Sequence, residues 1–429
     1  MDSVFEKWRR LVDARIPQVL DDCYQEWPEG VRAPSMPLMD AVQEQAKASS
    51  AGGKRLRALL VIASALAAMS RWSGSDAAEG GADGADSDAA EGGADGADSD
   101  AAALFSRALD VACAVEVFQT GALVHDDIID GSDLRRGAPA AHTALASAFA
   151  GFRGRALGRG DAGDSNAVSS ASVGDVAEIP LAVFASSDRA MGDNLGIMLG
   201  DYLASASLTA ASTAVSGRPE APAVVDTFLA MQRDVEVGQV LDLADSSLGL
   251  DDPAAIVTNC RLVFDRKTAS YTTVAPLRLG FLLAGMDAPQ AWKWGARIGA
   301  PAGIAFQIAD DLADVLPQNP PTGKPLGGDI LNGKRSVLLA DALEQGNEAT
   351  RRLLRETYAK PERDRDDIRL VTDAFVSSGA VDASRARIRR LWNETHEQIG
   401  AWQRETGVSG ESARALETMM ALFVPEQDR

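Results

Sequence analysis

Cysteine and histidine are scarce in this sequence, and their scarcity removes several classes of site. The 429 residues include only three cysteines, Cys23, Cys113 and Cys260, which show no paired spacing. A disulfide framework or a zinc site is therefore not indicated, and we expect a reducing compartment. The three histidines do not form a set of metal ligands either.

Long apolar runs and an excess of basic charge are also missing. No window of about 18 uninterrupted apolar residues occurs, so no segment is predicted to span a membrane. Residues 1–20 are charged and amphipathic, unlike a signal peptide, and we expect a cytoplasmic protein. The formal net charge of −20 disfavours nonspecific nucleic-acid binding, because a phosphate backbone needs a basic surface. The GxxxxGK[ST] pattern of a P-loop is absent.

The pattern of apolar residues predicts helices. Alternating patterns typical of β-strands are scarce, whereas helix-forming residues recur with apolar positions three and four apart. The segments that show this most clearly are 104–129, 221–244, 252–285, 301–315 and 335–343. We expect an all-α fold, a helical bundle whose site is built from side chains on facing helices.

Two segments interrupt this pattern. Residues 73–102 contain a tandem duplication, because AAEGGADGADSD at 77–88 returns unchanged at 89–100. Residues 151–175 are rich in Gly, Ser, Ala and Asp. Such segments bury too little apolar surface to order themselves, so we expect disordered insertions within a single domain, 1–429. The acidic duplication does not match the spacing of an EF-hand calcium loop.

Two aspartate-rich motifs are the main candidates for chemistry. In DDIID, Asp126 and Asp130 lie four residues apart and share one helix face, where like charges need a bridging cation. The same spacing returns in FQIADDLAD, which ends at Asp314. One such motif is usually a solvated helix face, but two copies predict Mg²⁺ sites that clamp a diphosphate. The candidate metal ligands are Asp126, Asp127, Asp130, Asp310, Asp311 and Asp314.

Basic residues adjoin these motifs and glycines. They occur in GGKRLR at 52–57, in RR at 135–136, in KT at 267–268 and in GKP at 323–325. Arg and Lys suit phosphate oxygens. Each of them alone would equally balance the charge of an acidic protein.

These motifs, in this order, resemble the trans-isoprenyl diphosphate synthases of the polyprenyl synthetase family. The resemblance rests on GGKRxR, the two DDxxD motifs, RRG after the first, and GQxxD and KT between them, over residues 52–343. It implies an isoprenoid-synthase-type helical bundle with a central cavity, usually a homodimer. It also implies head-to-tail condensation of isopentenyl diphosphate with an allylic diphosphate, with three Mg²⁺ ions.

The resemblance also implies roles for single residues. The positions implied to hold isopentenyl diphosphate are Lys54, Arg57, Gln119 and Arg136. Those implied to grip the allylic diphosphate are Arg135, Lys267 and Lys324. Thr268 and Gln307 match positions that line the site where the carbocation forms, and Asp242 matches an acid near the lysine. The catalytic set implied is Asp126, Asp130, Lys267, Thr268, Gln307 and Asp310.

Product length is expected to depend on the helix that ends in the first motif. Gly121 and Ala122, five and four residues before Asp126, are small and leave room for a growing tail. Phe118 lies about two turns deeper, at about 1.5 Å per residue, and is a candidate floor of the tail site. Geranylgeranyl diphosphate is the expected product, and longer polyprenyl diphosphates are the main alternative.

Three other functions remain open at this point. A terpene cyclase typically has one aspartate-rich motif paired with an Asn/Ser/Glu triad, which two full DDxxD motifs disfavour. A non-catalytic regulatory subunit of a synthase would lose aspartates or phosphate-binding residues that are present here. A metal-buffering protein would explain the aspartates but not the placement of the Lys, Arg and Gln residues.

Overall fold

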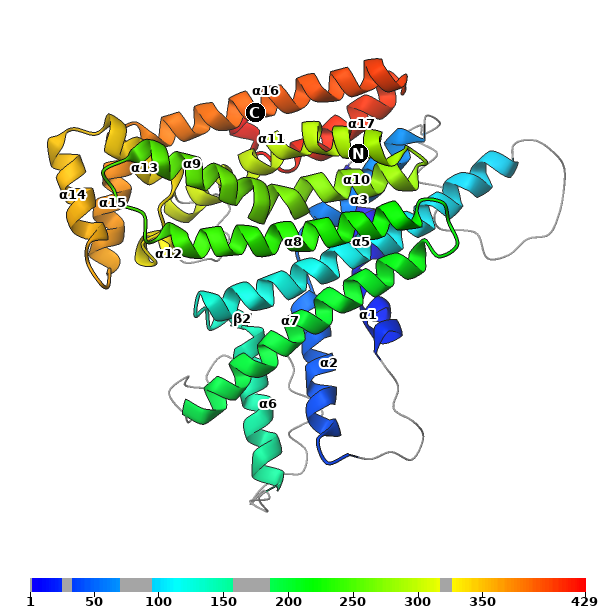
Figure 1. The fold of residues 1–429 in the computed structure, drawn as a ribbon, viewed down its shortest axis with the longest axis horizontal. Coiled ribbons are helices and arrows are strands. Elements are labelled where there is room, and N and C mark those ends of the chain that lie inside the picture. Colours follow the sequence, from blue (N-terminus) through cyan, green and yellow to red (C-terminus); the bar gives the residue numbers. More distant parts are fainter. Residues whose placement is uncertain (1, 25–32, 70–94, 157–185, 317–325) are drawn as a thin grey trace. The chain divides into compact units, whose positions relative to one another are not determined.

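The computed structural model describes residues 2–24, 33–69, 95–156, 186–316 and 326–429. These residues are almost entirely helical (Figure 1), as the sequence predicts. Within the described ranges, every helix is too short or too polar to cross a lipid bilayer.

The chain groups into two compact units. Unit 1 comprises Met1–Leu11, Lys54–Ala112 and Ala211–Arg429, and unit 2 comprises Val12–Gly53 and Cys113–Ala210. Helices α1 (Asp2–Cys23), α5 (Asp95–Ile129) and α7 (Ser186–Ala214) contribute residues to both units. Because the boundaries between the two units fall inside continuous helices, no linker sequence marks them.

Unit 1 is a bundle of helices. Apart from its parts of the shared helices it contains α3 (Leu56–Ala68), α8 (Ala221–Asp245), α9 (Pro253–Val263), the π-helix η3 (Phe264–Val274), α10 (Ala275–Leu283), α11 (Ala288–Val315), α12 (Gly328–Leu331), α13 (Val337–Gln345), α14 (Glu348–Tyr358), α15 (Arg365–Ser377), α16 (Ala380–Thr406), α17 (Gly410–Ala421) and the short η4 (Glu426–Asp428). Helices α8, η3, α11 and α16 pack side by side in that order (Figure 1).

Apolar packing and helix caps explain these elements. Buried side chains of α9, α11, α13, α15 and α16 form one hydrophobic cluster, which includes Ile308 and Leu339. The N-termini of two long segments are capped by aspartates: Asp252 accepts from the backbone N–H of Ala255 at 3.0 Å in α9, and Asp287 caps α11 in the same way. A cap of this kind stabilises a helix by about 1 kcal/mol.

Two of the predicted helical segments, 301–315 and 252–285, differ most in form from the expectation. Helix α11 begins at Ala288 rather than at residue 301. Pro301 is buried inside this helix and does not mark its start. The predicted helix 252–285 is three consecutive elements, since residues 264–274 wind as a π-helix. The apolar spacing predicts the helical segment but does not show the change in winding.

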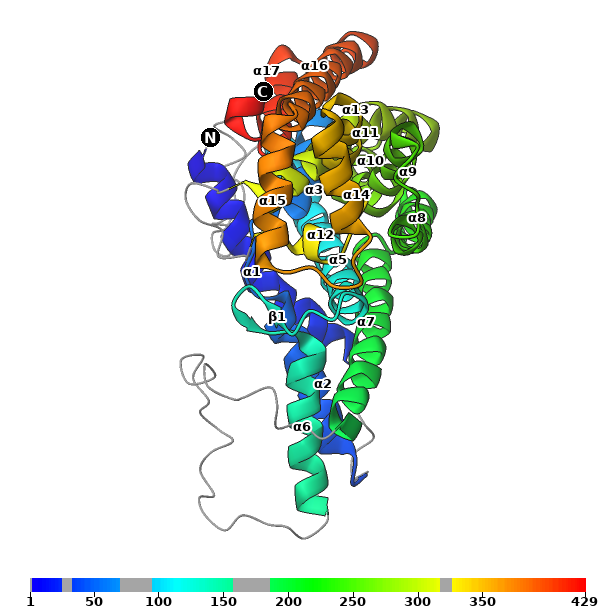
Figure 2. The same cartoon turned by 90° about the vertical axis from the view of Figure 1, so that its left-hand side faces the viewer.

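Apart from its parts of the shared helices, unit 2 contains α2 (Met36–Ser50), α6 (Ala141–Ala156) and a hairpin of two short strands. Helices α2 and α6 pack against each other (Figures 1 and 2). The hairpin pairs β1 (Leu134–Arg135) with β2 (Ala138–Pro139) in antiparallel register. It turns the chain directly after the first aspartate motif.

The ends of the two predicted insertions are helical. Helix α5 begins at Asp95, so residues 95–102 belong to a helix rather than to a disordered segment. Helix α6 continues to Ala156, which places residues 151–156 in a helix as well. Residues 95–102 include three alanines, which are good helix formers. Residues 151–156 contain two glycines and one alanine and continue the helix that precedes them. The rest of both predicted insertions lies outside the described residues.

Candidate active site

A π-helix carries the KT motif of unit 1. π-Helical segments are rare and frequently occur at functional sites. Helix α8 approaches η3 so closely that a Cβ atom at Gly238 would lie 2.3 Å from the backbone nitrogen of Lys267. Four residues further along α8, Asp242 Oδ2 lies 2.6 Å from Lys267 Nζ. The glycine and the aspartate of GQVLD therefore act together, because one lets the helices approach and the other holds the lysine.

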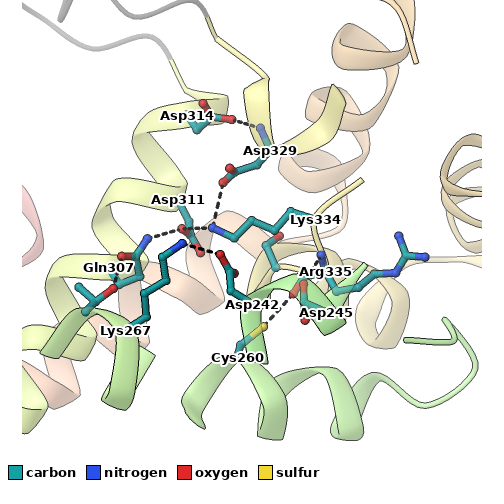
Figure 3. A network of polar contacts seen from close by, with 12 residues as sticks. Asp242, Asp245, Cys260, Lys267, Gln307, Asp311, Asp314, Asp329, Lys334 and Arg335 are labelled. Carbon is teal, nitrogen blue, oxygen red and sulfur yellow. Dashed lines mark hydrogen bonds and ion pairs between the residues drawn. The ribbon is translucent and has the colours of Figure 1, made fainter. Parts of the chain in front are cut away.

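A chain of polar contacts joins the KT motif to the second aspartate motif (Figure 3). Thr268 Oγ1 donates to Gln307 Oε1 at 2.7 Å, and Gln307 Nε2 donates to Asp311 Oδ1 at 2.9 Å. Lys334 Nζ lies 3.7 Å from the same Asp311 oxygen. Three residues implied by the resemblance, Thr268, Gln307 and Asp311, are thus brought together from η3 and α11.

Burial and charge compete at Asp311 and Lys334. The Asp311 side chain is only 5% exposed and that of Lys334 is 26% exposed. Burial raises the pKa of Asp311, and the Lys334 ammonium opposes this shift. Burial alone would lower the pKa of Lys334, but the carboxylates of Asp329 and Asp311 raise it well above its usual value. Asp311 Oδ2 is buried and accepts no hydrogen bond from the part of the chain that the structure describes.

The three aspartates of the second motif have different surroundings. Asp310 is exposed. Asp314 is buried, and its Oδ2 accepts from the backbone N–H of Asp329 at 2.9 Å, while its backbone carbonyl accepts from Gly327 at 2.7 Å. The motif therefore provides one carboxylate to solvent, whereas Asp311 and Asp314 contact other parts of unit 1.

Unit 1 also holds the three basic residues of GGKRLR, which are Lys54, Arg55 and Arg57. The guanidinium of Arg57 lies 4.3 Å from the centre of the Tyr271 ring, and its Nη2 donates to Thr272 Oγ1 at 2.8 Å. Arg57 therefore packs against η3, and Lys54 is exposed. The predicted phosphate ligand Lys324 lies outside the described residues.

In unit 2, the first aspartate motif lies at the end of α5. The backbone N–H of Asp130 donates to the Asp126 carbonyl at 2.8 Å, which continues the last helical turn. Asp126 is 23% exposed in its side chain and Asp130 is exposed. Asp127 is buried. Its Oδ1 accepts hydrogen bonds from Arg135 Nε, at 2.9 Å, and from Arg135 Nη2. Burial raises the pKa of Asp127, and Arg135 opposes this shift.

The arginines that follow the first motif point to different partners. Arg135, expected to grip the allylic diphosphate, is engaged with Asp127 and lies 3.9 Å from an oxygen of Asp126. Arg136 adopts a positive φ of 53° and its Nη1 donates to the Ala51 carbonyl at 2.9 Å, beside GGKRLR. Gln119 is half-buried in α5.

The surroundings of Gly121 concern the expected product length. Gly121 was expected to leave room for a growing tail, and a Cβ atom there would lie 2.9 Å from the carbonyl oxygen of Gly200 and 3.1 Å from Leu203 Cβ. The backbone of α7 fills the space beside this glycine. Ala122 is half-buried and Phe118 is 5% exposed.

The carboxylates of both motifs fit Mg²⁺ better than a metal with an all-protein site. Among the residues described, no group of three or more His, Cys, Asp or Glu side chains is arranged to hold a metal ion. Mg²⁺ typically takes one or two carboxylates and completes its shell with water and phosphate oxygens. Two accessible carboxylates in the first motif, one in the second and the unsatisfied Oδ2 of Asp311 agree with that chemistry.

Sequence reasoning left Asp329 out of the site and did not predict what Lys334 contacts. Lys334 was visible as a basic residue near the second motif, but its contact with Asp311 depends on the path of the chain after α12. Asp329 was not singled out from the sequence, yet its carboxylate lies 3.8 Å from Lys334 Nζ.

Known proteins resemble this chain in sequence. A family model described as polyprenyl synthetase matches residues 39–158 and 184–375. The geranylfarnesyl diphosphate synthase of Aeropyrum pernix is 26% identical over 322 residues, which are 74% of this chain and 83% of that protein. The geranylgeranyl diphosphate synthase of Saccharolobus solfataricus is 24% identical over 61% of this chain. The chain spans only 64% of that second relative.

Solved structures share the fold. The crystal structure of a geranylgeranyl pyrophosphate synthase from Corynebacterium glutamicum, complexed with isoprenyl diphosphate and magnesium, is similar with a TM-score of 0.66 at 25% identity, covering 98% of this chain and 97% of that one. A decaprenyl diphosphate synthase from Rhodobacter capsulatus has the same fold, with a TM-score of 0.64 at 18% identity, covering 100% and 98% of the two chains. The chain therefore belongs to the polyprenyl synthetase family, the trans-isoprenyl diphosphate synthases, which are prenyltransferases.

Proposed function

We propose that this prenyltransferase condenses isopentenyl diphosphate head-to-tail with an allylic diphosphate in a Mg²⁺-dependent reaction, and that its main product is geranylgeranyl diphosphate. The observation that carries the proposal is the polar chain Thr268–Gln307–Asp311–Lys334, together with the Lys267–Asp242 pair. It places cationic and hydrogen-bonding groups of the KT motif beside the second aspartate motif.

These residues suit the ionisation of an allylic diphosphate. The bond between the allylic carbon and the diphosphate oxygen breaks, and the leaving group needs fixed positive charge as it departs. Lys267 would supply that charge, because Asp242 holds its ammonium in one place. Thr268 and Gln307 would present oxygen dipoles to the allylic cation. Lys324 and Arg135 complete the proposed allylic diphosphate set.

The second half of the reaction forms the new carbon–carbon bond. The double bond of isopentenyl diphosphate attacks the allylic cation, and a proton then leaves to the departed diphosphate. We assign the binding of isopentenyl diphosphate to Lys54, Arg57, Gln119 and Arg136. Arg57 supports this assignment, because its contacts with Tyr271 and Thr272 fix a guanidinium beside the π-helix.

We assign the Mg²⁺ ions, three in number, to both aspartate motifs. Bound Mg²⁺ would neutralise the diphosphate charge as the leaving group departs. Asp126, Asp130 and Asp310 are the proposed direct ligands, because their carboxylates are the accessible ones. Asp127, Asp311 and Asp314 are the proposed supports, since each already contacts a protein group.

The proposed product length rests on Phe118 and Ala122 of α5. Ala122 presents a small side chain, and the Phe118 ring lies deeper along the same helix. The relatives named above as geranylgeranyl and geranylfarnesyl diphosphate synthases support a product of this range. A longer polyprenyl diphosphate is the alternative.

A homodimer is part of the proposal. One face of α8 exposes four large apolar side chains: Leu229, Val237, Val240 and Leu243. Val240 is the most exposed of them, at 66%. Several exposed large apolar side chains on one helix face often mark a protein–protein contact. Val240→Asp should shift the purified protein toward a monomer in sedimentation analysis, and an unchanged mass would contradict the use of this face.

Product analysis tests the function directly. The purified protein is incubated with Mg²⁺, labelled isopentenyl diphosphate and, separately, dimethylallyl, geranyl and farnesyl diphosphate, and the chain lengths are then resolved. Geranylgeranyl diphosphate as the main product supports the proposal. A ladder of longer products would support the proposed reaction but contradict the role of Phe118 as the floor of the tail site. No product with any primer would reject catalytic function and favour a regulatory subunit.

A further inference from the structure

Asp329 makes three contacts, one with the second aspartate motif and two with Lys334. Its backbone N–H donates to Asp314 Oδ2 at 2.9 Å, and its carbonyl accepts from the backbone N–H of Lys334 at 2.9 Å. Its carboxylate Oδ2 lies 3.8 Å from Lys334 Nζ (Figure 3). One residue thus connects α11 to Lys334 through both its backbone and its side chain.

Lys334 needs more than one carboxylate to stay in place. Its ammonium lies 3.7 Å from Asp311 and 3.8 Å from Asp329, and its side chain is 26% exposed. A lysine is a point charge on a flexible stem, so one ion pair fixes its position poorly. Two carboxylates on opposite elements, α11 and α12, hold the ammonium between them. The position of Lys334 in turn sets the charge felt by Asp311 and, through Gln307, the orientation of Thr268.

The fold of this segment does not depend on the Asp329 carboxylate. Arg363 Nε donates to the Ile330 carbonyl at 2.8 Å at the end of α12. Asp245 accepts from the backbone N–H of Arg335 at 2.7 Å, just after Lys334. These contacts, and both backbone hydrogen bonds of Asp329, remain when its carboxylate is replaced by an amide. The side chain therefore has an electrostatic role that can be separated from folding.

We propose that Asp329 is a positioning residue of the allylic diphosphate site, which acts by holding the Lys334 ammonium against Asp311. The inference rests on the proposed function. It predicts that the Asp329 carboxylate affects the binding of the allylic diphosphate and leaves that of isopentenyl diphosphate unchanged. Asp329 itself does not need to touch either substrate.

The matched variants are Asp329→Asn and Asp366→Asn. Both remove one carboxylate from unit 1, but the Asp366 side chain is 83% exposed and pairs only weakly with Arg369, at 3.7 Å. Asp329→Asn should raise the KM for the allylic diphosphate about tenfold, which corresponds to about 1.4 kcal/mol. The KM for isopentenyl diphosphate and the melting temperature should stay at wild-type values. Asp366→Asn should change none of the three.

Calorimetry with inorganic diphosphate and Mg²⁺ tests the inference without turnover. Asp329→Asn and Lys334→Met should each weaken binding, and the double variant should be no weaker than Lys334→Met alone, because both changes remove the same contact. Additive losses would overturn the inference, as would wild-type binding by Asp329→Asn. If the wild type bound no diphosphate and formed no product, both the proposed function and this inference would be wrong. An active wild type with an unaffected Asp329→Asn variant would overturn the inference alone.

Discussion

Substitution of Gly238 by alanine is the sharpest test of how α8 and η3 position the lysine of the KT motif. The added Cβ atom would lie 2.3 Å from the backbone nitrogen of Lys267 and 2.6 Å from its Cα atom. Because non-bonded atoms prefer about 3.5–4.0 Å, the two helices must separate by about 1 Å or more. Asp242 and Lys267 sit on these two helices at 2.6 Å, so their pair must lengthen.

Two opposing effects decide the outcome for stability. Alanine is favoured over glycine inside a helix by about 1 kcal/mol. Overpacking of a tight contact costs about 1–3 kcal/mol, and here the clash is with backbone atoms, which cannot rotate away. We therefore expect net destabilisation. A misplacement of about 1 Å at a reactive group can lower the rate by about 10²-fold, and we expect a loss of that order in kcat/KM.

The assay compares Gly238→Ala with Gly249→Ala. A Cβ atom at Gly249 would meet no atom within 4 Å, so this control adds the same methyl group without a clash. Prenyl transfer from a radiolabelled substrate gives kcat/KM, and urea unfolding gives the change in stability. If Gly238→Ala were as active and as stable as the wild type, the close approach of α8 to η3 would not position Lys267, and our reasoning would be wrong.

Three further predictions concern other parts of the molecule. Asp341 is 1% exposed and is held by Arg387, with Oδ1 and Nη2 2.7 Å apart, so Arg387→Leu should cost about 3–5 kcal/mol in urea unfolding. Replacing both partners by leucine should recover most of that loss; failure to recover it would contradict a purely electrostatic cost. Asp126→Ala and Asp310→Ala should each lower turnover by about 10²-fold or more, with unchanged melting temperatures, and near-normal rates would contradict a metal role. Burial raises the pKa of Asp245 from 3.8 to about 6, so the folded protein binds its proton more tightly. The contribution of Asp245 to the free energy of unfolding should therefore fall as pH rises from about 4 to about 6, and an Asp245→Asn variant with the pH dependence of the wild type would contradict this.

Much of the candidate site could be predicted from local sequence. The spacing of Asp126 and Asp130 places both on one helical face, and the structure continues the last turn of α5 to Asp130. The order of the motifs implied the pairing of Lys267 with Asp242, which the structure contains. These predictions depend on residues close together in the chain or on a set of motifs that occurs as a whole.

Other residues could not be assigned from the sequence, because their roles depend on what packs against them. Asp310 and Asp311 are adjacent in one motif, yet one is exposed and the other is 5% exposed beside Lys334. Gly121 is a small residue in the sequence, and only the structure shows that the backbone of α7 lies beside it. Asp329 was not assigned a role from the sequence, and only the turn after α12 brings it to Lys334.

The sequence by itself determined the all-α fold, the family and the reaction class. Helical periodicity and the order of short motifs are local properties, so they can be recognised without knowing how the helices pack. Only the tertiary structure decided which aspartates of each motif remain accessible and which glycines admit a neighbouring helix. The physical reason is that the periodicity of a helix fixes which residues share a face, whereas burial and charge at that face depend on the element that covers it.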